Sequence, residues 1–185
     1  MPDLIVNSWR LDRSTEVTYR YFAPDACEVV EGCVRAPGVR KLLLFDVGIA
    51  NIGRGDAVIG DPNERPDIFE FSPCHDHMHL QGFAVFKLLR RNGRLVVSAR
   101  KQGFCMRDER RYSSTAPAGR YDCDYQGITA GWQDIYYKWL DCQWLDITGV
   151  PPGVYILRVK ANPQGLIPER NYYNNVASVQ ILVPY

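Results

Sequence analysis

Hydrophobic residues recur along this chain in short runs that are separated by clusters of Gly, Pro, Asn and Asp. Tyr155, Leu157 and Val159 stand at alternate positions, so they would share one face of an extended strand. Residues 177–183 repeat this alternation near the C-terminus. The strands predicted from these patterns cover residues 4–11, 16–22, 40–51, 82–89, 95–100, 154–161 and 177–183.

No segment keeps a helical period of hydrophobic residues over several turns. Strands separated by turn clusters predict an all-β fold, a β-sandwich-like single domain with long loops and disulfides that spans residues 1–185. The polar stretch 107–125 is expected to be a long loop, bracketed by Cys105 and Cys123. Loops of this length in compact domains are usually functional or tied down.

The length and the net charge of the chain limit the number of domains and the kinds of partner that it can have. With 185 residues, it can build one domain with a sizeable core. The 22 Lys and Arg residues nearly balance 21 Asp and Glu residues, which argues against nucleic acid or an anionic membrane surface as a partner. No apolar run approaches the length of a membrane span, and no signal peptide is expected within this sequence.

Six cysteines are dispersed along the chain without a C-x-x-C pair, which disfavours a zinc ribbon or a thioredoxin-type motif. An even, dispersed set is typical of three disulfides in an oxidising compartment. We therefore expect a secreted or extracytoplasmic protein. Six reduced structural cysteines in a cytosolic protein are the alternative.

All three histidines of the chain, His75, His77 and His79, lie within five residues. Alternate positions of an extended segment point to one face, so the three imidazoles are expected to project together. Neutral imidazole is a ligand for zinc, copper, iron and nickel, so the run predicts a metal site. The alternative is three surface histidines on a solvated strand.

The spacing of these histidines also constrains the backbone. In a flat strand the Cα atoms of His75 and His79 would lie roughly 13 Å apart, at about 3.3 Å per residue. Each histidine reaches only about 6 Å from its Cα atom to a metal, given metal–nitrogen bonds of about 2 Å. A single ion held by all three therefore requires a bent segment.

Four motifs, taken in order, carry a resemblance to a known family. Together with matching residues between positions 151 and 175, they resemble the catalytic domain of lysyl oxidases, and the resemblance covers essentially the whole chain. The motifs are Cys74-His75-Asp76-His77-Met78-His79, Lys101-Gln102-Gly103-Phe104-Cys105, Asp134-Ile135-Tyr136 and Asp141-Cys142-Gln143-Trp144-Leu145-Asp146-Ile147-Thr148.

The resemblance implies a copper amine oxidase that converts a primary amine to an aldehyde and releases ammonia and hydrogen peroxide. Its copper ligands would be His75, His77 and His79. Its organic cofactor, lysine tyrosylquinone, would be built from Lys101 and Tyr136. Redox-active copper with oxygen can oxidise a nearby phenol to a quinone, which zinc cannot do.

Two further roles follow from the same resemblance. The register to Cys142 favours Tyr136 over the adjacent Tyr137 as the cofactor tyrosine. The base that removes a proton from the substrate stays open between Asp134 and Asp141, which both lie near Tyr136 in the sequence. Substrates would be primary amines, with protein lysine side chains, polyamines and small monoamines all as candidates.

The cysteine pairing is also implied by the resemblance. The family pattern has four disulfides over the matched stretch, and this chain lacks both members of one pair. The pairs that remain are Cys27–Cys74, Cys33–Cys142 and Cys105–Cys123.

Oxygen-bearing residues near both ends of the chain suggest a second metal site, and oxygen ligands of this kind suit calcium. Where the family usually has an aspartate, this chain has Asn171, which removes a charge and should weaken binding. An Asn-rich turn between strands is the alternative. The candidate ligands are Asp3, the backbone of Leu4, Glu169, Asn171, Asn174 and Asn175.

An exported amine oxidase that depends on copper and a quinone is thus the leading hypothesis. A non-catalytic metal-binding β-sandwich, which keeps the histidines without building the cofactor, is one alternative. A zinc hydrolase that uses the same histidines and an open fourth coordination position is another.

Overall fold

The structure is a computed structural model that describes residues 1–74, 76–100 and 105–185. Strands dominate these residues, and the all-β fold expected from the sequence is confirmed. The strands are β1 (Leu4–Val6), β2 (Glu16–Phe22), β3 (Gly38–Leu44), β4 (Val47–Asn51), β5 (Ala57–Gly60), β6 (Phe69–Ser72), β7 (His77–Leu80), β8 (Ala84–Leu89), β9 (Leu95–Arg100), β10 (Arg110–Arg111), β11 (Gln126–Ile128), β12 (Trp132–Tyr136), β13 (Trp144–Asp146), β14 (Gly153–Ala161) and β15 (Val176–Val183). The helical elements are α1 (Ser8–Ser14), α2 (Cys27–Val30) and the 3-10 turn η1 (Pro62–Glu64).

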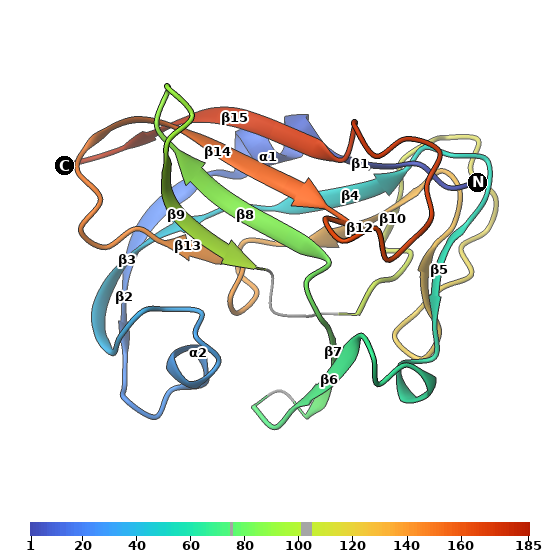
Figure 1. The fold of residues 1–185 in the computed structure, drawn as a ribbon, viewed down its shortest axis with the longest axis horizontal. Coiled ribbons are helices and arrows are strands. Elements are labelled where there is room, and N and C mark those ends of the chain that lie inside the picture. Colours follow the sequence, from blue (N-terminus) through green and yellow to red (C-terminus); the bar gives the residue numbers. More distant parts are fainter. Residues whose placement is uncertain (75, 101–104) are drawn as a thin grey trace.

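Two antiparallel sheets form the body of the molecule, with strand orders β1-β4-β12-β10 and β15-β14-β8-β9. In Figure 1, β14 and β8 cross in front of β4 and β12. Ile49 of β4, Phe86 of β8 and Leu157 of β14 are fully buried in one hydrophobic cluster. Phe45 meets Phe86 edge to face, with ring centroids 5.0 Å apart. The two sheets therefore enclose a shared core.

The alternation of hydrophobic residues predicted from the sequence is confirmed in the sheet β15-β14-β8-β9, here called the outer sheet. Tyr155, Leu157 and Val159 of β14 are buried, whereas Ile156 and Arg158 between them are half-buried and exposed, respectively. Leu157 pairs in register with Val179 of β15, whose burial alternates in the same way. Predicted strands 16–22 and 95–100 coincide with β2 and β9. Those at 82–89, 154–161 and 177–183 match β8, β14 and β15 within two residues.

Two predicted strands are wrong in part. The strand expected over 4–11 ends at Val6, because the side chain of Asn7 accepts a hydrogen bond from the Arg10 amide at 3.1 Å and so caps helix α1. The strand expected over 40–51 divides into β3 and β4, which belong to different sheets. At the break, the Asp46 carboxylate accepts bonds from Arg10 and from the Lys138 amide in place of a regular strand pairing.

The segment that carries the predicted histidine ligands lies outside the two large sheets. Figure 1 shows the β6–β7 hairpin on the same lower side of the molecule as α2. The disulfide Cys27–Cys74 joins them, with Cα atoms 5.7 Å apart. The predicted loop 107–125 contains one short strand, β10. No helix in the described ranges is long and apolar enough to cross a membrane.

Candidate active site

Strand β12 carries two buried titratable side chains, Asp134 and Tyr136. It lies between β4 and β10, with Asp134 opposite Ile49 and Tyr136 opposite Val47. Residues two positions apart on a strand point to one face, so both side chains face the same way. Both are almost fully buried and line the wall of a cavity of about 660 Å³.

Burial and mutual contact set the acidity of this pair. Burial raises the pKa of the Asp134 carboxyl to about 7, although a hydrogen bond with Tyr136 and the nearby charge of Arg107 act in the opposite direction. Burial, followed by the charge of Asp134, raises the pKa of the Tyr136 phenol well above 10. The Oδ2 atom of Asp134 has no hydrogen-bond partner among the described residues. This carboxyl can therefore exchange a proton near neutral pH.

Two of the three predicted metal ligands lie side by side on strand β7. The rings of His77 and His79 have centroids 4.8 Å apart at an angle of 55°, so their alternate positions do bring them together. His79 is buried and His77 is exposed at the cavity. His75 lies outside the described residues. Asp76, which directly precedes His77, has a φ of 54°, a left-handed conformation that bends the chain at this residue.

The cavity brings β7 and β12 together, although these strands belong to different sheets. His77 and Met78 contribute from β7, and Asp134 and Tyr136 from β12. The second predicted cofactor residue, Lys101, lies outside the described residues, so its position relative to Tyr136 stays a prediction. The remaining lining residues are Asp61, Pro62, Asn63, Cys105, Arg107, Cys123, Asp124, Gln126, Ile135 and Leu140.

The cavity wall carries more negative than positive charge. Arg107 is the one lining cation of the described chain, and it pairs with Glu109 at 2.5 Å. Asp61 and Asp124 form no ion pair with another described residue. Carboxylates without a cationic partner attract a positively charged ligand.

The two candidate bases differ in position. Asp134 lines the cavity, is buried and contacts Tyr136. Asp141 is exposed and is not part of the cavity wall. The geometry therefore favours Asp134.

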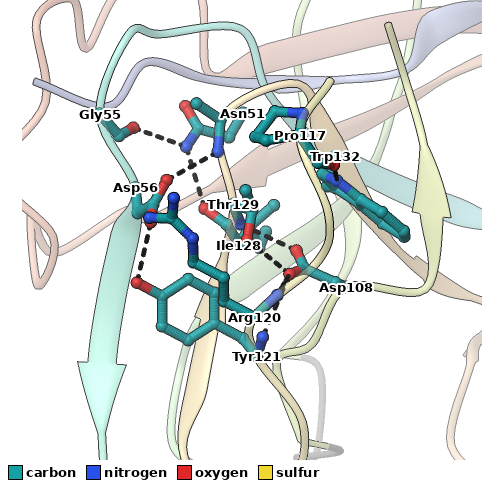
Figure 2. A network of polar contacts seen from close by, with 11 residues as sticks. Asn51, Gly55, Asp56, Asp108, Pro117, Arg120, Tyr121, Ile128, Thr129 and Trp132 are labelled. Carbon is teal, nitrogen blue, oxygen red and sulfur yellow. Dashed lines mark hydrogen bonds and ion pairs between the residues drawn. The ribbon is translucent and has the colours of Figure 1, made fainter. Parts of the chain in front are cut away.

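Asp56 and Asp108, which the sequence did not single out, anchor the loop that carries Arg107, Cys123 and Asp124. Figure 2 shows the network. The Asp108 carboxylate accepts bonds from the Arg120 and Tyr121 amides at 2.6 and 3.1 Å. It also accepts from the amide and hydroxyl of Thr129 at 2.8 and 2.6 Å.

Asp56 holds the other side of the same loop. Its carboxylate accepts from the Arg120 guanidinium at 2.8 Å, the Tyr121 hydroxyl at 3.1 Å and the Ala130 amide at 3.0 Å. Burial and the charge of Asp56 raise the pKa of the Tyr121 phenol to about 12, so it stays a donor at physiological pH. Aspartates separated from their partners by up to 74 residues leave no local pattern that could have identified them.

All three disulfides join the cysteines that the resemblance paired. They are Cys27–Cys74, Cys33–Cys142 and Cys105–Cys123, with Cα separations of 5.7, 5.2 and 5.0 Å. Glu31 lies close to the sulfurs of Cys33 and Cys142, a cluster that could suggest another metal site. Both sulfurs are used in the disulfide, so neither is available as a thiolate ligand.

The predicted calcium ligands are brought together in part. Asn174 donates to Asp3 at 2.7 Å, Asn175 donates to Glu169 at 2.7 Å, and the Leu4 amide donates to Glu169 at 2.6 Å. The side chain of Asn171 instead accepts from the Tyr173 amide at 3.0 Å. Four of the six predicted residues therefore contribute side chains to one cluster, Leu4 contributes its backbone, and Asn171 caps a local turn.

Comparisons of the sequence with known proteins agree on one family. The lysyl oxidase family profile matches residues 2–184. "Lysyl oxidase homolog 2" of Bos taurus is 34% identical over 187 residues, which cover 95% of this chain and 24% of that protein. "Protein-lysine 6-oxidase" of Homo sapiens is 33% identical over 199 residues, which cover 98% of this chain and 45% of that protein.

The chain thus spans about a quarter of the first of these relatives and less than half of the second. Among solved structures, the CARDB domain of the PF1109 protein from Pyrococcus furiosus aligns with a TM-score of 0.36 and 14% identity. That alignment covers 98% of this chain and 88% of the other.

Proposed function

The chain belongs to the lysyl oxidase family, and from that premise we propose that it oxidises primary amines with copper and a quinone made from its own side chains. The amine, oxygen and water would yield an aldehyde, ammonia and hydrogen peroxide. One observation carries the proposal: His77, a predicted metal ligand, and Tyr136, the predicted cofactor tyrosine, line the same cavity.

The histidine run fits a copper ion held by His75, His77 and His79. The rings of the last two lie 4.8 Å apart, and the left-handed φ of Asp76 bends the chain next to them. A bend is what the spacing of three ligands on one ion requires. When bound, copper would supply the redox chemistry by which oxygen converts a phenol to a quinone. Zinc has no redox chemistry, so it could not build the cofactor.

Tyr136 would supply the ring of the cofactor and Lys101 its amine. Because the pKa of Tyr136 is well above 10, the ring is a neutral phenol before maturation. It is held in the cavity wall by β12, which pairs with β4 on one side. Lys101 lies outside the described residues, so the covalent link between the two side chains stays part of the proposal.

Asp134 would accept the proton that leaves the substrate carbon. A general base works best when its pKa lies close to the pH at which the enzyme operates, and the pKa of Asp134 is about 7. Its Oδ2 atom is buried on the wall of the cavity and has no hydrogen-bond partner among the residues that the structure describes. Asp141, the other candidate, is exposed and away from that wall.

The cavity also suits the substrate class. A volume of about 660 Å³ is within the range of small-molecule sites. Asp61 and Asp124 on its wall would attract a substrate that arrives as an ammonium ion. Protein lysine side chains belong to this class, and the name of the human relative supports them as substrates. Three disulfides support an oxidising, extracytoplasmic location.

The proposal is tested by loading metal-free protein with copper in air. We expect a peptide that links Lys101 to Tyr136, with one oxygen gained and four hydrogens lost, and peroxide release on addition of a primary amine. Zinc-loaded protein should show neither. Tyr136→Phe should abolish both signals, whereas Tyr137→Phe, the adjacent aromatic residue, should keep them.

Copper-loaded, oxygenated protein without the linked peptide and without peroxide release from any amine would contradict this function. Stoichiometric copper under those conditions would instead identify a non-catalytic metal-binding protein. Hydrolysis by the zinc-loaded form would identify the hydrolase alternative.

A further inference from the structure

A cluster of polar side chains, here called the terminal latch, joins the start of β1 to the turn before β15. Its members are Asp3, Glu169, Arg170, Asn174 and Asn175. The Arg170 amide also donates to the Pro2 carbonyl at 2.9 Å. Asp3, Glu169 and Asn175 are almost completely buried. The latch contains most of the residues predicted to bind calcium, and it adds one that was not predicted, Arg170.

Each carboxylate oxygen of the latch already accepts a hydrogen bond from the chain. Asp3 Oδ1 accepts from Asn174, and Asp3 Oδ2 accepts from Arg170. Glu169 Oε1 accepts from the amides of Asn162 and Asn175 at 2.5 and 2.7 Å. Glu169 Oε2 accepts from the Leu4 amide at 2.6 Å. A calcium ion, which needs six to eight oxygens, would have to displace several of these donors.

Arg170 supplies a positive charge at this position. Its Nε and Nη2 atoms donate to the same oxygen of Asp3 at 2.9 and 2.5 Å. Asp3 is fully buried, so its charge needs a partner in the folded protein. The guanidinium provides that partner and, unlike a bound ion, cannot be removed by a chelator.

The charge count also disfavours calcium. Affinity for calcium rises with the number of anionic ligands. Here two carboxylates face one guanidinium, and the third family position is the neutral Asn171, which caps its own turn. A calcium ion that displaced the guanidinium would therefore break the Arg170–Asp3 ion pair and would gain only two anionic ligands in return.

Two side-chain oxygen atoms of the latch could accept a cation. The Oδ1 atoms of Asn174 and Asn175 are buried without a hydrogen-bond partner in the described chain. Both side chains, however, already donate their Nδ2 atoms to the two carboxylates. Their orientation is thus fixed by the ion-paired form of the latch.

We propose that the Arg170–Asp3 ion pair takes the place of a calcium ion and that the terminal latch closes without metal. The latch fixes β1, which pairs with β4, and β4 in turn pairs with β12. It thereby supports the sheet that carries Asp134 and Tyr136. Opening it should lower the thermal stability of the whole domain.

The test measures the midpoint of thermal unfolding, Tm, with excess EDTA or with millimolar calcium chloride, and the calcium content of dialysed protein. We expect the wild-type Tm to change by less than about 1 °C between the two conditions. Arg170→Gln should lower Tm by about 2–6 °C, the size expected for a partly buried ion pair in a domain of this length. Arg158→Gln is the matched control, because Arg158 is exposed and, within the described part of the chain, its side chain donates only to the neutral Ser178 hydroxyl.

Three outcomes would overturn the proposal. They are a wild-type Tm raised by more than about 2 °C in calcium, stoichiometric calcium after dialysis, and an Arg170→Gln variant no less stable than Arg158→Gln. None of these measurements involves amine oxidation, so they leave the proposed function untouched.

Discussion

Asp134 and Tyr136 share one face of β12 and act on each other's ionisation in opposite directions: the hydrogen bond with Tyr136 favours the ionised form of Asp134, whereas the charge of Asp134 disfavours ionisation of Tyr136. Burial raises the pKa of both groups, and the charge of Asp134 raises that of Tyr136 further. The phenol therefore stays neutral across the physiological range, while the carboxyl titrates near pH 7. Within this pair, a change of pH near neutrality therefore alters the protonation state of Asp134 and leaves that of Tyr136 unchanged.

The first prediction concerns the pH dependence of turnover. At saturating amine, kcat should rise about tenfold per pH unit at acid pH and level off above about pH 7, because Asp134 must be ionised to accept a proton. Asp134→Asn should lower kcat by about 10²- to 10⁴-fold. Copper content and the linked peptide are measured in each variant, so that failed maturation is recognised.

Asp141→Asn is the control for this prediction, because Asp141 lies near Asp134 in the sequence but is exposed and outside the cavity wall. Equal losses in both variants, with the cofactor intact, would remove Asp134 from the role of base.

The second prediction concerns stability. The pKa of Asp134 rises from 3.8 to about 7 on folding, so the native state binds a proton more tightly than the unfolded state. The free energy of unfolding should therefore fall as pH rises from about 4 to 7, and the contribution of the protonated carboxyl is lost above that range. Asp134→Asn removes this dependence.

The expected gain of Asp134→Asn over the wild type is small at pH 4 and on the order of 4 kcal/mol at pH 8, because one pKa unit corresponds to about 1.4 kcal/mol. Urea unfolding of metal-free protein at the two pH values measures it. A difference that does not change with pH, or that grows toward acid pH, would show that the carboxyl is not protonated in the native state.

The hydrophobic pattern predicted the long strands of the outer sheet, because β14 and β15 each bury one face. It could not predict the break at Asp46, since the partners that hold that residue come from α1 and from the segment after β12. Short strands such as β7 carry too few residues to show a period, so no strand was predicted over His77–Leu80 although its histidines were singled out. The hydrophobic pattern therefore predicted the elements that are decided by neighbouring residues, and it failed where contacts between distant residues decide the structure.

The candidate site likewise contains residues that their motifs identify and residues that only the fold identifies. Residue types with distinctive chemistry, such as His77 and Tyr136, could be predicted as site residues from their motifs, and both line the cavity. The choice between Asp134 and Asp141 was not, because it depends on burial and on which residues the fold brings to the cavity. Arg170 illustrates the limit most clearly, since its partner Asp3 lies 167 positions away.

The third prediction addresses the network around the long loop. Asp108→Ala removes four hydrogen bonds and leaves the partner amides of Arg120, Tyr121 and Thr129 without their acceptor. The expected loss of stability is on the order of 3 kcal/mol. Peroxide release should also fall, because the loop carries Arg107 and Asp124 of the cavity wall. Thermal unfolding and the peroxide assay measure the two effects.

Asp25→Ala provides the comparison, because Asp25 is exposed. If Asp108→Ala matched it in both stability and activity, the loop would not need the network.

The fourth prediction concerns the metal. His77→Ala should weaken copper binding by more than the 10- to 100-fold typical of losing a residue that only orients a ligand. Glu70→Gln is the control, since Glu70 is exposed and pairs in register with His79. Metal analysis after dialysis gives the readout. Full copper content in His77→Ala would remove His77 from the ligand set.

The last prediction separates the local role of a disulfide from its general one. Cys27–Cys74 ties α2 to the residue before His75, and Ser72, next to it on β6, donates to Glu31. The paired substitution Cys27→Ser and Cys74→Ser should therefore lower the free energy of unfolding by about 4 kcal/mol on the chain-entropy model, and it should also lower copper affinity.

The matched pair Cys33→Ser and Cys142→Ser opens a longer loop of 109 residues and should cost at least as much stability. Because that disulfide does not adjoin the histidines, its loss should leave copper affinity near the wild-type value at a temperature where both variants are folded. Equal copper affinities in the two variants would mean that Cys27–Cys74 contributes to the metal site only through overall stability.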